Sequence, residues 1–473
     1  MLNLFRSKFI GDRDFYKKVF VIAFPIIIQN SISNFVQLLD NIMVGQVGTD
    51  QMNAVAIVNR LMFVFILCVW GSVCGAGIFT AQYFGKGDHE GVRNTFRAKI
   101  ILVGIISITA ISFFYFKGAC LIEKFIHESD NIGNAERTMF YGKKYLLINL
   151  IGLVPLSFSF IYANTLRDIG ETSVPMRASI AAVIVNLILN YLLIFNTRVV
   201  HILGLNIKIW GAGFGVEGAA IATVCARFVD AAVNVLWTHT HKVRCMFIEG
   251  ALKTLRIPVS LMKEIIKKGA PLAMNETMWA LGLTMLDQRY SLKGLYVVGA
   301  LSITNTITNF FNVFYFAIGE SISIIIGQLL GARKNDEAKS TVPKMIFISM
   351  SVCVLVGFLM AMCRNAFPAI YNTENEVREL ASKFILIVAC FMPIHACLHG
   401  CYFTIRSGGK TLITCLFDSV FVWGFAVTTA FILTEFTSLN IVMIYLIVSS
   451  LDLIKCTIGL ILVKKGVWVN NMV

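Results

Sequence analysis

The chain has 473 residues, of which 57% are hydrophobic and only 14% are charged, and its mean hydropathy is +0.75. A soluble domain carries about a quarter charged residues, so the composition excludes a water-soluble globular protein and predicts an integral membrane protein. We attribute the net charge of +14 at pH 7 to membrane topology and attraction to anionic lipid, and we expect no nucleic-acid partner.

Apolar runs of roughly 18 or more residues recur along the chain, which is the pattern of membrane-spanning helices. The segment before the first run is polar and basic, so we expect no cleavable signal peptide. The predicted fold class is all-α, with twelve transmembrane helices in two six-helix lobes. We place the spans near residues 19–44, 53–84, 94–116, 138–164, 174–195, 213–238, 265–290, 296–330, 340–363, 379–404, 411–433 and 439–463.

The first half of the chain is repeated in outline in the second half. Three pairs of identical residues lie at one constant separation: Pro25 and Pro271, Gln82 and Gln328, and Gly85 and Gly331. The segment 167–172 also matches 406–411. We therefore divide the chain into an N-lobe (1–238), a cytosolic linker (239–262) and a C-lobe (263–473). Six spans per half predict parallel repeats, and in membrane transporters the substrate path lies between such repeats.

The distribution of basic residues predicts the orientation of the chain. If the N-terminus faces the cytoplasm, the segments on that side hold most of the 41 Lys and Arg residues. Cytoplasmic loops are enriched in these residues, so we expect both termini in the cytoplasm and a multi-pass protein of the inner (plasma) membrane. Most of the 12 cysteines fall within spans, where Cys behaves as a small hydrophobe. We predict no metal, no disulfide framework and no cofactor.

Asp40 lies deep in the first span, with no basic residue within a helical turn of it. A lone carboxylate at the centre of a membrane helix costs about 2.5–3.5 kcal/mol on insertion scales, and such residues usually serve a function. Desolvation there would favour proton exchange near neutral pH. Asp40 is our first candidate for cation or proton coupling. The alternative places it in water at the outer end of the span, which the nearby Gly45 and Gly48 allow.

Two acidic residues on the seventh span are further candidates. Glu276 follows Pro271 by five positions, far from the basic linker, so we predict a cation or proton site there. Asp287 lies near the outer end with Arg289 two residues on, so we interpret it as a solvated cap or ion-pair residue with a supporting role.

Pairs of polar residues four positions apart share one face of a helix. His395 and His399 on the tenth span form one such pair, and a histidine titrates near physiological pH. We predict a second proton site at His395, supported by His399; the alternative is a pair of hydrogen-bonded packing residues. Asn186 and Asn190 on the fifth span could join helices or offer carbonyl oxygens to a cation.

Pro25 and Pro271 each interrupt a long apolar run. Proline removes a backbone hydrogen bond and kinks a helix, so either residue could act in gating or make a static kink. Two pairs of oppositely charged residues lie three positions apart: Arg227 with Asp230, and Asp452 with Lys455. We interpret both as ion pairs that neutralise each other rather than as transport residues.

No catalytic motif stands out in the sequence. We find neither a Walker-type phosphate loop nor a GxSxG nucleophile elbow. The sequence therefore predicts that the chain is not an enzyme and is not driven by ATP.

Several blocks, in this order, resemble the multidrug and toxic compound extrusion (MATE) family, and they cover nearly the whole chain. The blocks are Pro25 through Asp40 to Gly48, Ala81 to Gly85, Asn164 to Thr172, Gly218 to Thr223, and Gly327 to Ala332. The resemblance implies two six-helix lobes forming a V, alternating access, and multidrug (xenobiotic) efflux by an antiporter that exchanges organic cations for H+ or Na+.

Some functional positions of the family are matched in this chain and others are not. Asp40 falls at the family's acidic position on the first helix, and Asn186 at a polar position on the fifth. The residue four positions after Asn186 is Asn190 where some branches have a carboxylate, and His395 stands where some members keep an acid. These departures favour H+ over Na+ as the coupling ion. Glu276 belongs to an Asn-Glu-x-x-Trp-x-x-Gly pattern that looks like one bacterial branch.

Two other functions are the alternatives to an antiporter. A lipid-linked oligosaccharide flippase of the same superfamily often has extra spans and a strongly basic cavity, and we count neither. A multispan membrane transferase would need clustered Asp or His at the membrane surface, which the sequence lacks. We expect a monomer that moves a small, organic, cationic substrate within the lipid bilayer.

Overall fold

The computed structural model describes residues 9–125, 134–202, 205–371 and 373–473, and nearly all of them are helical. The N-lobe contains α2 (Arg13–Gly45), α3 (Thr49–Lys86), α4 (His89–Glu123), α5 (Ala135–Asp168), α6 (Ser173–Ile194), the antiparallel strands β1 (Asn196–Ile202) and β2 (Leu205–Ala212), and α7 (Val216–Thr240). A linker with one short helical turn, η1 (Met246–Ile248), leads to the second lobe.

The C-lobe contains α8 (Val259–Ser291), α9 (Leu295–Gly331), α10 (Asn335–Met362), the short α11 (Ala366–Ala369), α12 (Asn375–Ser407), α13 (Thr411–Cys415), α14 (Thr428–Phe436) and α15 (Ile441–Lys464). Between α13 and α14 the same helix passes through two π-helical stretches, η2 (Leu416–Val420) and η3 (Val422–Val427). Short π-helical insertions are frequent at functional sites.

All twelve predicted spans are helices. Eleven helices in the described part of the chain are long and apolar enough to cross a membrane. The twelfth, α8, has 33 residues but carries more charge, including Glu276 and Asp287. The hairpin of β1 and β2 was not predicted, although its Val and Ile residues are typical of strands. The predicted all-α class is otherwise confirmed.

Helix ends follow local capping rules. The carboxylates of Asp12 and Asp88 accept hydrogen bonds from the backbone N–H groups of Phe15 (2.9 Å) and Gly91 (2.8 Å), and Asn134 caps α5 in the same way. Such side chains satisfy N–H groups that the first helical turn leaves free. Gly87 ends α3 with a φ of 80°, a left-handed conformation that glycine adopts without steric cost.

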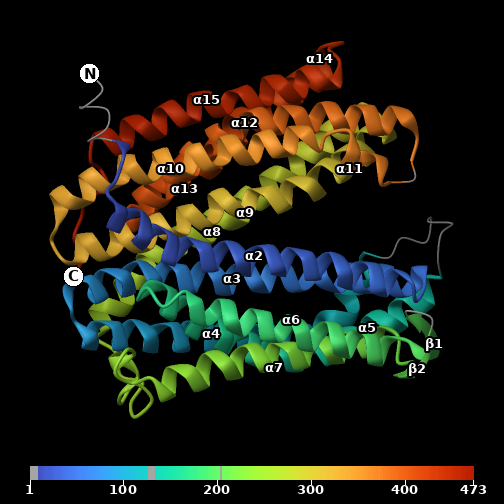
Figure 1. Ribbon diagram of the computed structural model, residues 1–473, viewed down its shortest axis with the longest axis horizontal. Helices are drawn as coiled ribbons and strands as arrows, with labels where there is room; N and C mark the ends of the chain where they lie inside the picture. Colours follow the sequence, from blue (N-terminus) through green and yellow to red (C-terminus); the bar gives the residue numbers. More distant parts are fainter. Residues whose placement is uncertain (1–8, 126–133, 203–204, 372) are drawn as a thin grey trace.

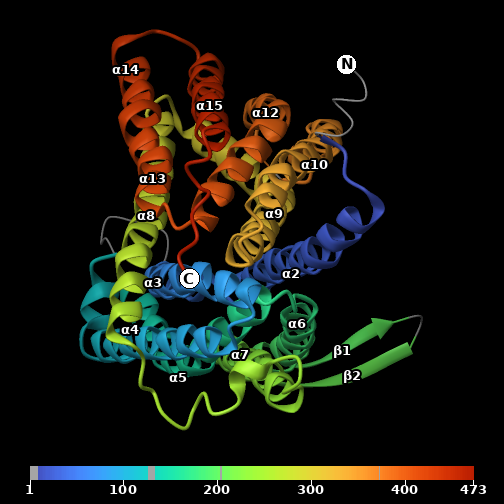
Figure 2. The same cartoon turned by 90° about the vertical axis from the view of Figure 1, so that its left-hand side faces the viewer.

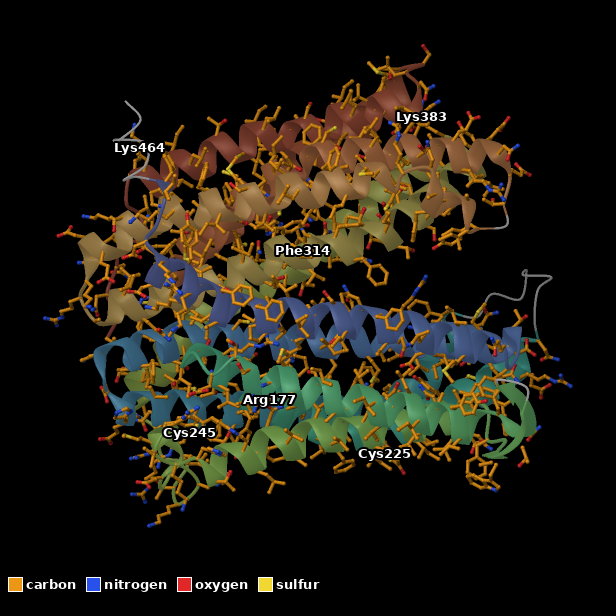
Figure 3. All side chains as sticks on the ribbon, in the orientation of Figure 1. Arg177, Cys225, Cys245, Phe314, Lys383 and Lys464 are labelled. Atoms are coloured by element: carbon orange, nitrogen blue, oxygen red, sulfur yellow. The ribbon has the colours of Figure 1, made fainter. Side chains whose placement is uncertain are left out.

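The two lobes form separate layers that meet along one seam (Figure 1). The start of α2, the C-terminal residues and the linker lie at one end of the bundle, which we call the terminal end, and the β1–β2 hairpin marks the opposite hairpin end. The helices of the two lobes converge at the terminal end. Figure 3 shows mostly carbon along the flanks of both lobes, as expected for surfaces that face lipid.

Glycines allow the lobes to meet closely at the terminal end. A Cβ added to Gly85 would lie 1.9 Å from the carbonyl oxygen of Gln328, and one on Gly331 would lie 1.8 Å from the carbonyl oxygen of Gln82. Gly75 on α3 faces Gly269 on α8 in the same manner. Of the residues that mark the sequence repeat, Gln82, Gly85, Gln328 and Gly331 are therefore those at which α3 and α9 cross, and a side chain on either glycine would push the lobes apart.

Candidate functional site

The N-lobe places Asp40 between α2 and α6. It is half-buried and accepts a hydrogen bond from Nδ2 of Asn190 at 2.6 Å. Asn190 also donates to Oδ1 of Asn186 at 3.0 Å, and both amides are almost fully buried. Among the described residues no Lys, Arg or His lies within ion-pair distance of Asp40. Among the described residues its hydrogen-bond partner is the single amide of Asn190, so the carboxylate can accept a proton or a cation.

Asn190 was predicted as a supporting residue and is the direct partner of Asp40. Its own Oδ1 is buried and has no hydrogen-bond partner among the residues that the structure describes. A buried acceptor without a partner is costly. Together with the Asp40 carboxylate it offers oxygen atoms on adjacent helices, which suits a proton or a small cation.

The C-lobe surrounds Glu276 with a larger polar network. Oε1 of Glu276 accepts a hydrogen bond from the Tyr402 hydroxyl (3.1 Å). The neighbouring Asn275 is fully buried and donates to both Tyr402 (3.3 Å) and Asp418 (3.1 Å). Asp418, in the π-helical stretch η2, pairs with Lys455 of α15 at 2.6 Å. A lysine therefore neutralises Asp418, whereas Glu276 has no basic partner at ion-pair distance among the described residues.

His395 and His399 have different surroundings although they share a helix face. Nε2 of His395 lies 3.1 Å from a carboxylate oxygen of Asp452. His399 instead stacks on Tyr315, with ring centroids 4.7 Å apart. The structure thus assigns the polar contact to His395 and the packing contact to His399.

The predicted pairing of charged residues along one helix was wrong. Lys455 pairs with Asp418 and not with Asp452, whose partner is His395. In the N-lobe Asp230 accepts a hydrogen bond from Ser159, while Nη1 of Arg227 is buried and has no hydrogen-bond partner. Side chains three apart on a helix can touch, but inside a bundle the facing helices offer better-placed partners.

Asp287 and the two prolines occupy other positions. Asp287 is exposed near the hairpin end, where Asn305 donates to it at 3.4 Å, and Arg289 lies over the Phe431 ring instead of pairing with it. Pro25 is buried within α2. Pro271 lies between Gly269 and Ala273, the α8 residues that meet Gly75 and Gly71 of α3. Because Pro271 is two residues, or about 200° around the helix, from each of them, it adjoins this contact between the lobes without sharing its face.

Sequence reasoning missed the charged residues buried at the seam. Lys99 is fully buried and donates to Asp168 (2.8 Å) and Thr165 (3.0 Å). Across the seam Arg167 approaches Glu320 at 3.6 Å. Arg406 is buried with two nitrogens lacking partners, beside a cavity of about 20 Å³ that Asp168 also lines. The repeated block at 167–172 and 406–411 pointed to these positions but not to their partners.

Each lobe thus holds its own acidic centre, Asp40 in one and Glu276 in the other. None of the hydrogen bonds or ion pairs of the described residues joins the two centres. Within the described residues no group of three His, Cys, Asp or Glu side chains could hold a metal ion.

Two parallel six-helix lobes in a membrane, each with a half-buried carboxylate that lacks a basic partner among the described residues, define a membrane transporter built on an internal repeat. The MatE family profile matches residues 25–192 and 274–433, which is more than half of the chain. The chain therefore belongs to the MatE family, whose members are transporters and not enzymes.

Known relatives agree with this assignment along nearly the full length. The chain is 21% identical over 466 residues to the probable multidrug resistance protein NorM of Thermotoga maritima, covering 97% of this chain and 94% of that protein. It is 22% identical to the probable multidrug resistance protein YoeA of Bacillus subtilis, covering 88% and 86%. A crystal structure of a MATE protein in its straight conformation superimposes with a TM-score of 0.84 at 16% identity, covering 99% and 98%.

Proposed function

We propose that the chain is a multidrug antiporter that exports organic cations across the cytoplasmic membrane in exchange for H+ or Na+. The single observation that carries this proposal is the half-buried Asp40 carboxylate, which accepts a hydrogen bond from Asn190 and has no basic partner among the described residues. The names of the relatives, which are probable multidrug resistance proteins, support export of varied small organic molecules.

The mechanism follows from competition for one negative charge. An ionised Asp40 attracts a cationic substrate, and a proton that binds the carboxylate removes the attraction and releases the substrate. Protonation is favoured as pH falls, so substrate binding at equal pH on both sides should weaken with acidification. A ligand shifts the lobes between two arrangements only if it binds one of them more tightly. Glu276, held by the Tyr402 hydroxyl, is the corresponding proton or cation site of the C-lobe.

The orientation of the chain in the membrane decides whether the closed end of the seam faces the cytoplasm or the outside. With the N- and C-termini in the cytoplasm, as the basic residues favour, the terminal end is cytoplasmic and the lobes are closed on the cytoplasmic side. The present conformation then corresponds to release of substrate to the outside. If the lobes separated at Gly75, Gly85, Gly269 and Gly331, with Pro271 of α8 nearby in the chain, substrate could enter from the cytoplasm. We assign this cycle to a monomer.

The test uses purified protein in liposomes with an imposed pH gradient or an imposed Na+ gradient, each applied alone. We expect a pH gradient to drive transport of a cationic dye such as ethidium. The Asp40→Asn variant should insert and fold, because an asparagine oxygen can still accept the hydrogen bond of Asn190, but it should lose gradient-driven transport. Asp336→Asn is the matched control, since the side chain of Asp336 is fully exposed.

Each outcome of this test is decisive. Dye transport by Asp40→Asn at the wild-type rate would remove Asp40 from the mechanism. Transport driven by a Na+ gradient alone, without a pH gradient, would replace H+ by Na+ as the coupling ion.

A further inference from the structure

The segment that follows α15 folds back into the seam between the lobes. We call residues 467–473 the seam segment. Gly466 reverses the chain with a φ of 68°, and Trp468, only 2% exposed, donates its indole N–H to the carbonyl oxygen of Val463 at 3.0 Å. Figure 2, viewed from the terminal end, shows the end of this segment beside α3, between the two lobes.

The seam segment is attached to the C-lobe along its first part. A Cβ on Gly408, just after α12, would lie 1.8 Å from the carbonyl oxygen of Trp468, so the segment runs directly over this glycine. Nδ2 of Asn470 donates to the carbonyl oxygen of Gly408 (3.2 Å), and Nδ2 of Asn471 donates to that of Leu330 (2.8 Å). These contacts fix the segment to α9 and to the end of α12.

The same segment also binds the N-lobe through one side chain. Gln82 of α3 is fully buried. Its Oε1 accepts the backbone N–H of Met472 at 2.8 Å, and its Nε2 donates to the carbonyl oxygens of Ser407 (3.1 Å) and Asn470 (3.3 Å). The seam segment therefore satisfies a buried amide of the opposite lobe.

Apolar contacts extend this attachment. Met472 and Val473 pack against a cluster that contains Ala76 and Phe79 of α3, Ala98 of α4 and Ile265 of α8. The side chains of Met472 and Val473 are thus partly buried against a cluster to which both lobes contribute.

These two attachments cannot both survive if the lobes separate at the terminal end, since Gln82 then moves away from Gly408 and Leu330. We propose that residues 467–473 are an internal latch: they stabilise the arrangement closed at the terminal end and release α3 when the seam opens. The segment stays with the C-lobe, to which α15, Trp468 and both asparagines hold it. This inference rests on the proposed exchange between two lobe arrangements, but not on the identity of the substrate or of the coupling ion.

The first test is hydrogen–deuterium exchange of the full chain in nanodiscs, read by mass spectrometry. Gly331→Ala should open the seam, because its Cβ would meet the carbonyl oxygen of Gln82 at 1.8 Å. We expect the backbone amide of Met472, which donates to Gln82 across the seam, to be protected in the wild type and to exchange about tenfold faster in Gly331→Ala, because that hydrogen bond is lost when the lobes separate. Gly104→Ala is the matched control, since an added Cβ there meets nothing within 4 Å.

The second test starts from the latch itself. The double variant Asn470→Ala/Asn471→Ala removes two anchoring hydrogen bonds, so the terminal ends of α3 and α9 should exchange about tenfold faster. Lys465→Ala, at an exposed position next to the segment, should match the wild type.

The latch is overturned if α3 and α9 become exposed in Gly331→Ala while the backbone amide of Met472 stays protected. It is equally overturned if the double asparagine variant leaves exchange at the seam unchanged. Because exchange needs neither dye nor ion gradient, failure of the latch leaves the antiport test standing, and failure of antiport leaves the latch standing.

Discussion

Gln82 and Gln328 occupy matching positions in the two lobes but have different partners. Gln328 makes one hydrogen bond across the seam, from Nε2 to the carbonyl oxygen of Asp168 (3.0 Å). Gln82 makes the corresponding bond to Ser407, the residue that matches Asp168 in the repeat, and is further bound by the seam segment. The repeat therefore determines where the lobes touch, while other parts of the chain determine how strongly each contact is held.

The same contrast holds for the buried charges. Lys99 and Asp168 form a buried ion pair in the N-lobe. The matching residues of the C-lobe are Met345 and Ser407, both buried and uncharged. The C-lobe instead has its buried pair at Asp418 and Lys455, next to Glu276. The two lobes share a backbone arrangement but have developed separate electrostatic centres, so equivalent substitutions should have unequal effects.

The largest expected effect concerns the buried ion pair of the N-lobe. Lys99→Met copies the C-lobe residue but leaves the Asp168 carboxylate buried without its cation, which costs about 3–5 kcal/mol. The double variant Lys99→Met/Asp168→Ser copies both C-lobe residues and should recover most of the stability. Thermal unfolding in detergent measures both. Lys144→Met, in the exposed pair with Glu217, is the control and should change stability by less than about 1 kcal/mol. A double variant as unstable as the single one would show that the lobes are not interchangeable here.

The next effect compares the two acidic centres in transport. Glu276→Gln keeps an oxygen for the Tyr402 hydroxyl and removes the charge, as Asp40→Asn does for Asn190. We expect Asp40→Asn to abolish dye transport driven by a pH gradient and Glu276→Gln to slow it by at least about tenfold, or 1.4 kcal/mol. Initial rates in liposomes measure both. Full activity of Glu276→Gln would restrict coupling to the N-lobe.

A smaller difference is expected between the seam glutamines. Gln82→Leu leaves the N–H of Met472 and the carbonyl oxygens of Ser407 and Asn470 without their partner, whereas Gln328→Leu affects only the carbonyl of Asp168. At about 1 kcal/mol for each lost bond, Gln82→Leu should lower stability by about 2–3 kcal/mol and Gln328→Leu by about 1. Thermal unfolding of the two variants under the same conditions measures the ratio of their stability losses. Equal losses would show that the seam segment does not contribute to stability.

The smallest effect concerns the linker, which follows the N-lobe as the seam segment follows the C-lobe. Arg93 and Arg97 of α4 donate to the linker carbonyls of Phe247 and Gly250, so the linker is bound within its own lobe. Burial, together with the negative charge of Glu171, raises the pKa of the Cys245 thiol to about 12. At pH 8 the reactive thiolate is therefore scarce, and it increases only as pH rises toward that value. Maleimide labelling of Cys245, read by peptide mass spectrometry, should stay slow in Gly331→Ala as in the wild type. Faster labelling would mean that the linker opens with the seam.

The positions of the spans could be predicted from the sequence because membrane insertion depends on local composition. All twelve predicted spans are helices, and the glutamines and glycines that mark the repeat lie at the crossing of α3 and α9. The acidic candidates Asp40 and Glu276 could be found because a carboxylate in an apolar run is visible without a structure. Their partners, Asn190 and Tyr402, lie on helices far away in the chain.

Sequence neighbours were a poor guide to electrostatic partners. Asp452 and Lys455 are three residues apart, yet each pairs with another helix. Asp418 and Arg406 were not singled out from the sequence. Only the folded bundle shows that Asp418 pairs with Lys455 and that Arg406 is buried beside Asp168.

The sequence by itself determined the membrane location, the twelve helices, the parallel repeat and the acidic residues, because hydropathy, proline and glycine act within a few residues of their own position. Only the tertiary structure decided which charges are neutralised, where the lobes close, and that residues 467–473 fill the seam. Those outcomes depend on distances between helices that the chain order leaves open.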